Sequence, residues 1–405
     1  MTGRTLAAFA AGLMLAVPAA AHADTFNGRI AFSSFRVDPT FRTGDIFTMN
    51  DDGSDLRQVT DNPEDDAQSD WSPDGRDIVY RIRKPGQRTN FEVSRMTAAG
   101  TEHTRLTFTP DRQASSQPAW YPNRSAILFR RSGPGLVASI WGMGTLGESP
   151  EQLFDPPGAQ FYPSLSPDMT RFLFATTKSP TGDTDRAIET MAADGSGLTT
   201  LFDVPRAFDS GPAWSPDGKR IAFESNADVA GGNPERDEEI WMMDADGSNP
   251  IQLTHNDVHD EGAAWSPDGT MLAYSSGPDN DHVDINVMTT GGVHLRRLTD
   301  FAGRDESPDW QAIPAPATDM RCGDLPDAGI RDIRAAGEGM SCKQALGLAA
   351  EWSPAERKGA RPGKVQGYDA EAEDFGGVAR VVLTHRGNRE DGAGNDKLVA
   401  FLAQA

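Results

Sequence analysis

Carboxylates at a regular spacing are the residues of this chain best suited to carry chemistry. A polar or acidic residue recurs five positions before a Trp or Leu, as Asp66, Ser115, Gln160, Asp209, Asp260 and Asp305, and Glu261 and Glu306 follow the last two. If the fold brings these positions around one axis, their carboxylates could hold a hard cation or a basic peptide terminus. The alternative is a local function, in which each aspartate accepts backbone N–H groups where its strand begins. Both hypotheses are open at the level of sequence.

Other motifs are weaker candidates for a site. The segment HNDVHDE (255–261) contains His255 and His259, but two histidines four apart share a face only on a helix, and this segment leads into a predicted strand. GMGTLG (142–147) matches a dinucleotide-binding glycine motif only formally, because it falls on a predicted hairpin turn. DADGSN (244–249) has its Gly at the fourth position, whereas an EF-hand loop needs Gly at the sixth. No G-x-S-x-G motif for a hydrolase nucleophile occurs in the sequence.

The elements that must position the carboxylates come from an internal repeat. The first marker stands at Trp71, Trp120, Leu165, Trp214, Trp265 and Trp310. The second marker is a Met followed four residues later by Gly, at Gly53, Gly100, Gly147, Gly195, Gly247 and Gly292. Because both markers keep one period of roughly 45 to 51 residues, the chain is predicted to contain six copies of one structural unit.

Each unit is predicted to consist of short β-strands joined by tight turns. Runs such as RIAFSS (29–34) and RIAFES (220–225) are rich in β-branched and aromatic residues and are too short for helices. In Trp-Ser-Pro-Asp-Gly, Pro sets φ at the first corner of a turn, Asp caps the turn and Gly takes the positive φ. An Asp-Gly-Ser turn predicts a second hairpin, so each unit supplies four antiparallel strands. We expect the marker Trp and Met side chains to pack between units.

The two ends of the array are complementary. The first unit starts at GRIAFSS (28–34) without a preceding Trp strand, and the last ends at PDWQAIP (308–314) without a following IAF strand. Joining them completes one unit and removes the sheet edges that an open array would expose. The predicted fold class is therefore all-β, a six-bladed β-propeller closed by N- and C-terminal strands in one blade. A linear solenoid is the alternative, but solenoids need polar caps.

These residues also resemble a known family. PAWSPDGKRIAFES (212–225) with IWMMDADGSNPIQLT (240–254) is similar to the WD40-like repeats of TolB-type six-bladed propellers, and the resemblance extends over residues 28–314. It implies an interaction module of the cell envelope that has no catalytic residues. Propellers of this type also gate prolyl-oligopeptidase-like enzymes, but the residues after the ring are too few for an α/β-hydrolase domain, which argues against a peptidase.

Two units depart from the family pattern. The third has Leu165 in place of Trp and Met169 in place of the turn Gly, and the second has YPNR (121–124) in place of Ser-Pro-Asp-Gly. We expect altered turns in these two blades.

The segments outside the repeat predict an exported protein with a second domain. Residues 1–23 have Arg4, an apolar run and a small-residue end, which is typical of a signal peptide. Residues 24–316 form the predicted propeller, and 317–405 a small α+β module with a helix at SCKQALGLAAEW (341–352) followed by strands at ARVVLTH and KLVAFLA.

Cysteine usage fits this export. The only two cysteines, Cys322 and Cys342, lie in the second domain, and an even count in an exported chain predicts one disulfide. No segment after the signal is apolar for the length that a spanning helix needs.

Composition narrows the function. The 60 Asp and Glu against 38 Lys and Arg give a net charge of −22, which disfavours binding to nucleic acid or to anionic membranes. We expect a secreted or periplasmic, monomeric, non-enzymatic scaffold that binds an envelope protein, a peptide or a small ligand and needs no cofactor, although the acidic channel mouth leaves room for a divalent cation. The competing hypothesis is a metal-dependent hydrolase or lyase that uses this mouth. A third is a purely structural propeller that presents the C-terminal module.

Overall fold

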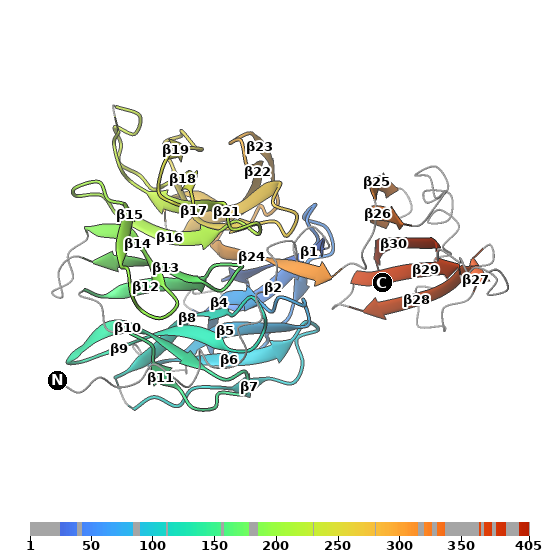
Figure 1. The fold of residues 1–405 in the computed structure, drawn as a ribbon, viewed down its shortest axis with the longest axis horizontal. Coiled ribbons are helices and arrows are strands. Elements are labelled where there is room, and N and C mark those ends of the chain that lie inside the picture. The colour runs from blue at the N-terminus through green and yellow to red at the C-terminus, as the bar shows by residue number, and fades with distance from the viewer. Residues whose placement is uncertain are drawn as a thin grey trace. The chain divides into compact units, whose positions relative to one another are not determined.

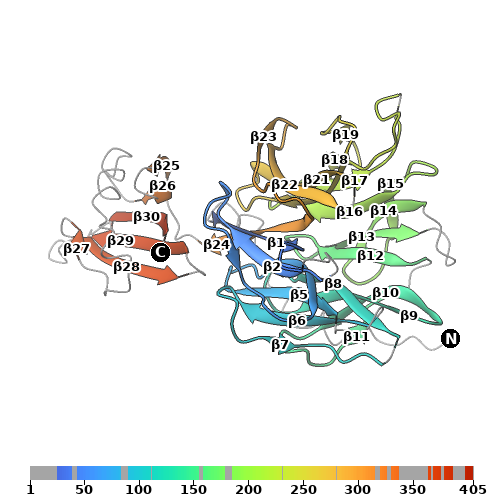
Figure 2. The same ribbon diagram turned by 180° about the vertical axis from the view of Figure 1, so that it is seen from behind.

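The computed structural model describes residues 25–38, 43–83, 90–110, 112–154, 158–177, 185–229, 231–279 and 281–314, together with the backbone of six later strands. Two compact units divide the chain, with Arg29–Gln311 in the first and the residues from Ala312 onward in the second. The first unit consists of six four-stranded antiparallel sheets arranged around an axis (Figures 1 and 2). The predicted six-bladed propeller is confirmed.

Five blades are continuous in sequence, and each uses four successive strands. Blade 1 contains β4 (Asp65–Trp71), β5 (Asp77–Arg83), β6 (Phe91–Thr97) and β7 (Thr104–Arg105). Blade 2 contains β8 (Ala114–Trp120), β9 (Ile127–Gly133), β10 (Leu136–Met143) and β11 (Glu151–Gln152). Blade 3 contains β12 (Gln160–Leu165), β13 (Arg171–Thr177), β14 (Arg186–Ala192) and β15 (Thr199–Phe202). Blade 4 contains β16 (Asp209–Trp214), β17 (Arg220–Ser225), β18 (Glu239–Asp244) and β19 (Ile251–Gln252). Blade 5 contains β20 (His259–Trp265), β21 (Met271–Asp279), β22 (His282–Thr289) and β23 (His294–Arg297).

The sixth blade joins the two ends of the repeat. Its sheet order is β24 (Asp305–Pro314), β1 (Thr25–Ser34), β2 (Asp45–Met49) and β3 (Arg57–Gln58). The backbone N–H of Arg29 donates to Oε1 of Gln311 at 3.0 Å, and Nε2 of Gln311 donates to the carbonyl of Gly75 in blade 1 at 2.8 Å. Trp310 is buried in one apolar cluster with Ile30. Gln311 therefore links the two ends of the repeat to each other and to the next blade.

The Ser-Pro-Asp-Gly turns have the predicted geometry. In blade 1 the N–H of Gly75 donates to the carbonyl of Ser72 at 2.8 Å, and Gly75 has a φ of 68°. The expectation of altered turns in blades 2 and 3 was wrong, because Arg124 and Met169 take the glycine position with a φ of 59° in each case and make the same hydrogen bond. Both side chains accept a left-handed backbone that normally costs about 1 kcal/mol or more.

The marker residues pack one blade against the next. Trp71, for example, lies in a buried cluster with Ile46 of the sixth blade and Ile78 of its own blade, as expected for the marker Trp. The second marker does more than form a turn. A Cβ at Gly100 would lie 2.5 Å from the carbonyl oxygen of Val59 in the preceding blade, and its φ is 72°. This glycine is required both by its backbone conformation and by the close approach of two blades.

The second unit is a six-stranded sheet in the order β25, β26, β30, β29, β28, β27. Its bounds are β25 (Met320–Leu325), β26 (Ile330–Ala336), β27 (Lys364–Val365), β28 (Tyr368–Asp374), β29 (Val378–His385) and β30 (Lys397–Gln404). The two strands predicted near the C-terminus are β29 and β30, whereas the other four were missed because their sequences are short or mostly polar. The predicted helix at 341–352, Cys342 and the predicted signal peptide lie outside the described residues, so the disulfide with Cys322 stays a prediction. In the described part of the chain no helix has the length and apolar character needed to cross a membrane.

Candidate functional site

The aspartates singled out from the repeat are buried at the start of the innermost strands. Asp66 is fully buried in β4, and its Oδ2 accepts a hydrogen bond from the side-chain amide of Asn62 at 2.6 Å. Asp260 in β20 is also fully buried and accepts the same bond from Asn256 at 2.8 Å. Burial raises the pKa of Asp66 to about 7 and that of Asp260 above its ordinary range. In both blades the carboxyl is therefore hydrogen-bonded to an asparagine of the loop that precedes its strand.

The other two aspartates are held in the same way by different partners. Asp209 is fully buried, and its Oδ1 accepts from the hydroxyl of Ser225 at 2.5 Å. Asp305 is fully buried and accepts from the guanidinium of Arg36 at 2.5 Å. Burial raises the pKa of Asp209 to about 7. This geometry favours the local function over a shared ligand site.

The two predicted glutamates lie one residue further along and are half-buried. Glu306 pairs with Arg304, and burial is the main cause that raises the pKa of its carboxyl. Glu261 lies close to Glu224 of β17, which accepts the N–H of Gly262 at 2.8 Å. Burial first, and Glu261 second, raise the pKa of Glu224 to about 7. Among the described residues no group of three or more His, Cys, Asp or Glu is placed to hold a metal ion.

A bulge recurs in the innermost strand of every blade and was not expected from the sequence. The residue three positions before each marker Trp or Leu has a left-handed backbone with φ of 51 to 66°, at Gln68, Gln117, Tyr162, Gly211, Gly262 and Ser307. In blades 1 to 5 the register with the second strand shifts at this point. Such a bulge turns the N–H and the side chain away from the regular ladder.

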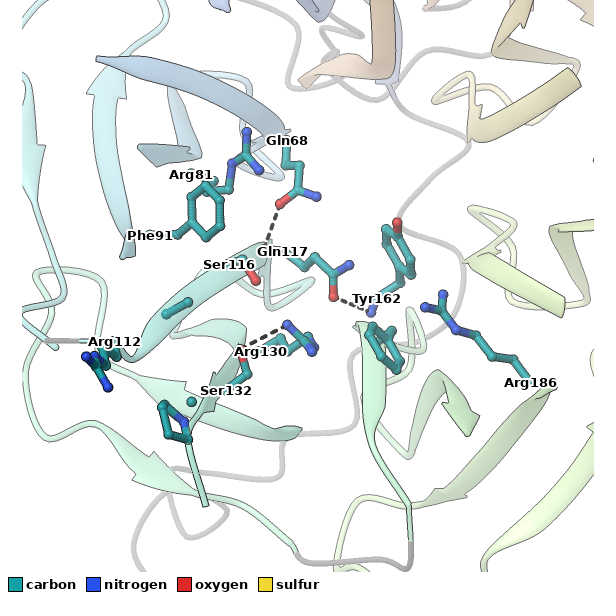
Figure 3. A pocket seen from close by; sticks show the side chains of 14 residues that line it. Gln68, Arg81, Phe91, Arg112, Ser116, Gln117, Arg130, Ser132, Tyr162 and Arg186 are labelled. Carbon is teal, nitrogen blue, oxygen red and sulfur yellow. Dashed lines mark hydrogen bonds between the residues drawn. The ribbon is translucent and has the colours of Figure 1, made fainter. Parts of the chain in front are cut away.

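The bulges link adjacent blades through side-chain amides. The N–H of Gln117 donates to Oε1 of Gln68 at 3.1 Å, and the N–H of Tyr162 donates to Oε1 of Gln117 at 3.0 Å (Figure 3). Three consecutive blades are thereby joined where their innermost strands begin. Within the described residues the Nε2 groups of both glutamines donate no hydrogen bond, so both can donate to a ligand.

A pocket of about 740 Å³ lies against this chain of bulges (Figure 3). Blades 1 to 3 supply its lining. The lining residues that the structure describes are arginine, aromatic, amide, hydroxyl and small residues, with no Asp or Glu among them: Gln68, Arg81, Phe91, Arg112, Ala114, Ser116, Gln117, Arg130, Ser132, Gly133, Pro134, Phe161, Tyr162 and Arg186. Four arginines and no carboxylate stand among the described lining residues, which makes this lining cationic in a chain whose net charge is −22.

Two of these arginines share one aromatic ring. The guanidinium carbons of Arg130 and Arg186 lie 4.4 Å and 3.9 Å from the ring centroid of Phe161. Because one face cannot hold two guanidinium groups at such distances, they lie on opposite faces of the ring. Burial and the nearby Arg186 lower the pKa of Arg130 to about 10, so Arg130 stays protonated at neutral pH.

The remaining two arginines differ in their partners. Arg81 lies 4.5 Å from the ring centroid of Phe91 and forms a salt bridge with Asp65 at 3.2 Å. Arg112 is exposed at the rim of the pocket. A cationic pocket of this size, with amide and hydroxyl donors beside the arginines, is suited to bind an anionic group.

Comparisons with known proteins agree with the fold. No protein-family model matches the chain. Curated relatives include the uncharacterized protein Atu1656 of Agrobacterium fabrum (29% identity over 160 residues), the uncharacterized peptidase YuxL of Bacillus subtilis (30% over 102 residues) and the Tol-Pal system protein TolB of Anaeromyxobacter sp. strain K (31% over 123 residues). The matches cover 38%, 24% and 30% of this chain, but only 52%, 15% and 26% of those proteins.

A solved structure agrees over a longer span. TolB from Acinetobacter baumannii matches with a TM-score of 0.58 and 19% identity, covering 70% of this chain and 66% of that one. The chain has a TolB-like six-bladed β-propeller fold. At 19% identity this similarity shows the fold alone. The chemistry of the pocket in this TolB-like propeller follows from its own lining residues.

The pocket of this TolB-like propeller could have been found by comparing blades position by position. One register position in the second strand of each blade holds Ser33, Arg81, Arg130, Ala175, Glu224 and Ser275. The arginines of blades 1 and 2 are adjacent at this position, and Arg186 joins them from β14. These arginines carry no repeat signal, because the site depends on residues that differ between blades.

Proposed function

We propose that this protein is an exported, non-enzymatic binding propeller of the cell envelope, and that its arginine-lined pocket receives an anionic group of a partner protein, a peptide or a small ligand. The observation that carries the proposal is the pair Arg130 and Arg186, which flank Phe161 and form no salt bridge within the described residues. The TolB-like fold supports an envelope location and a scaffold function.

The lining chemistry favours binding over catalysis. General acid–base catalysis works best with a side chain whose pKa lies near the working pH. The pKa of Arg130 is about 10, and burial raises the pKa of Tyr162 further above its ordinary range. Both groups therefore keep their protons at neutral pH, and the part of the lining that the structure describes contains no Asp, Glu, His, Cys or Lys. Such a set can hold an anion but has no base to move a proton.

Affinity capture from a cell-envelope extract tests this function. The wild-type protein is compared with Arg130→Glu and Arg186→Glu, which reverse charge inside the pocket, and with Lys219→Glu, which reverses charge at a position with 80% side-chain exposure. We expect the pocket variants to lose a captured component that the Lys219 variant retains. Equal recovery by all four proteins, each verified as folded by its unfolding transition, would remove the pocket from the function.

One observation favours keeping a second candidate. Glu261 is near enough to Glu224 to raise the pKa of its carboxyl, although no third described carboxylate joins them in a metal-binding group and Glu306 is paired with Arg304. A divalent cation bound there would relieve their repulsion and is the requirement of the metal-dependent hydrolase or lyase hypothesis. Calorimetry with calcium or manganese tests it. Heat that Glu224→Gln and Glu261→Gln abolish supports this candidate, and the absence of heat removes it.

A further inference from the structure

The described lining of the pocket contains four arginines and no carboxylate. Of the four lining arginines, Arg81 is paired with Asp65. Arg112, Arg130 and Arg186 form no salt bridge within the described part of the chain. The lining therefore presents three cationic groups that have no salt-bridge partner among the described residues, although Glu224 of blade 4 acts on Arg186 at longer range. A single carboxylate, such as the end of a peptide chain, would leave most of this charge uncompensated.

The central pair of cations is held in place before any ligand arrives. The guanidinium of Arg186 lies between two rings, 3.9 Å from the centroid of Phe161 and 4.1 Å from that of Phe208. Arg130 donates from Nε to the carbonyl of Gln160 at 3.1 Å and from a terminal nitrogen to the hydroxyl of Ser132 at 3.2 Å. Fixed side chains lose little conformational entropy on binding, so these arginines are preorganised.

This arrangement has an electrostatic cost that a ligand can relieve. Arg130 and Arg186 carry like charges at one ring, and the charge of Arg186 contributes to the lowered pKa of Arg130. The fold does not require an arginine at the position of Arg130, because the same register position holds Ala175 in blade 3 and Ser275 in blade 5. Guanidinium groups pair best with oxyanions that accept several N–H donors at once. A volume of about 740 Å³ leaves room for an organic group attached to the anion.

We propose that this pocket binds a doubly charged oxyanion of the phosphate monoester class, with Arg130 and Arg186 as the two residues that determine its preference for two charges over one. This inference rests on the proposed function, since it specifies the charge and chemical class of the anionic group. The donors available beside the two arginines are the amides of Gln68 and Gln117 and the hydroxyl of Ser116.

Calorimetric titration of the full-length protein with three probes tests the charge preference. Glycerol phosphate carries close to two charges at pH 7.5, sulfate carries two and acetate carries one. We expect glycerol phosphate and sulfate to bind about tenfold or more tightly than acetate, because charge-assisted hydrogen bonds multiply with the second charge. At pH 5.5 glycerol phosphate takes up its second proton, whose pKa is about 6, and we expect its affinity to fall while that of sulfate does not.

Variants assign the preference to residues. Arg130→Gln and Arg186→Gln are each expected to weaken sulfate binding by about tenfold or more, Arg186→Lys to recover part of the loss, and Lys219→Gln to change nothing. Acetate binding as tightly as sulfate, with both lost in the Gln variants, would overturn the dianion proposal but leave the anion-binding function. Failure of every probe to bind the wild-type protein would overturn both. The probe comparison uses the wild-type protein, so it stands even if a variant does not fold.

Discussion

Asp209 should make this protein less stable as the pH rises, and replacing it should remove that effect. Its carboxyl is fully buried, and it accepts from the hydroxyl of Ser225 at 2.5 Å and from the N–H of Val204 at 3.3 Å. Burial raises its pKa from 3.8 to about 7 in the folded state. Asp209→Asn is nearly isosteric with the protonated side chain and can keep the bond from Ser225. The variant therefore imitates the neutral carboxyl at every pH.

The direction of the pH dependence follows from the pKa values of Asp209 in the unfolded and folded states. Below pH 3.8 the carboxyl is protonated in the folded and unfolded states, and its contribution to stability is fully present. Between pH 3.8 and about 7 only the unfolded state ionises, so the free energy of unfolding falls by about 1.4 kcal/mol per pH unit. Above pH 7 both states are ionised and the loss levels off. From pH 5 to pH 8 the loss covers roughly two units, which is about 3 kcal/mol.

Urea denaturation of both proteins at pH 5, 6, 7 and 8 measures this difference directly. We expect the variant to gain about 3 kcal/mol on the wild type between pH 5 and pH 8, because all other titrating groups are common to both proteins and cancel. Asp194→Asn is the matched control, since Asp194 is fully exposed and its pKa is lowered by hydrogen bonds from Ser196. Its curve should run parallel to that of the wild type over this range. If the Asp209→Asn curve is also parallel, the carboxyl is not the buried, neutral group that we infer.

Three further substitutions test the fold and the pocket by their effect on the free energy of unfolding. Gly100→Ala should cost about 2 kcal/mol or more, because its Cβ would lie 2.5 Å from the carbonyl oxygen of Val59 at a φ of 72°. Gly197 also has a positive φ, but a Cβ there meets nothing within 4 Å, so Gly197→Ala should cost less. Equal losses would contradict the contact between the blades. Trp310→Ala should cost about 3 to 5 kcal/mol in thermal or urea unfolding, because the side chain is only 4% exposed in the closing blade, and a loss under about 1 kcal/mol would contradict the closure. Arg130→Gln should change the free energy of unfolding by no more than about 1 kcal/mol, because the loss of the cation–π contact with Phe161 is offset by the loss of charge repulsion with Arg186. A larger loss would indicate a structural function for this arginine.

The repeat made the fold predictable. Trp71 and its counterparts mark one strand in each unit, Ser-Pro-Asp-Gly marks the following turn, and the incomplete units at Ile30 and Trp310 indicate that the two ends share a blade. These signals are local, because a turn residue and a strand pattern specify backbone geometry over only a few residues. Repetition then makes the signal strong enough to specify the whole ring.

The prediction of altered turns in blades 2 and 3 was wrong because the fold tolerates a local substitution there. Met169 and Arg124 replace the turn glycine, yet both adopt its left-handed conformation, since the strands on either side hold the turn in place. The preference of a single residue is about 1 kcal/mol, and the packing of a blade exceeds it.

By itself, the sequence determined the number of blades, their strands and the closure between the two ends of the repeat, since each depends on a periodic sequence pattern. Only the tertiary structure decided that Asp66 and Asp209 turn into the protein and that Arg130 and Arg186 meet at Phe161. The physical reason is that β9 of blade 2 packs against β12 of blade 3, where a left-handed bulge sets the direction of the N–H and side chain of the innermost strand. That direction depends on the neighbouring blades, and no pattern within one blade contains it.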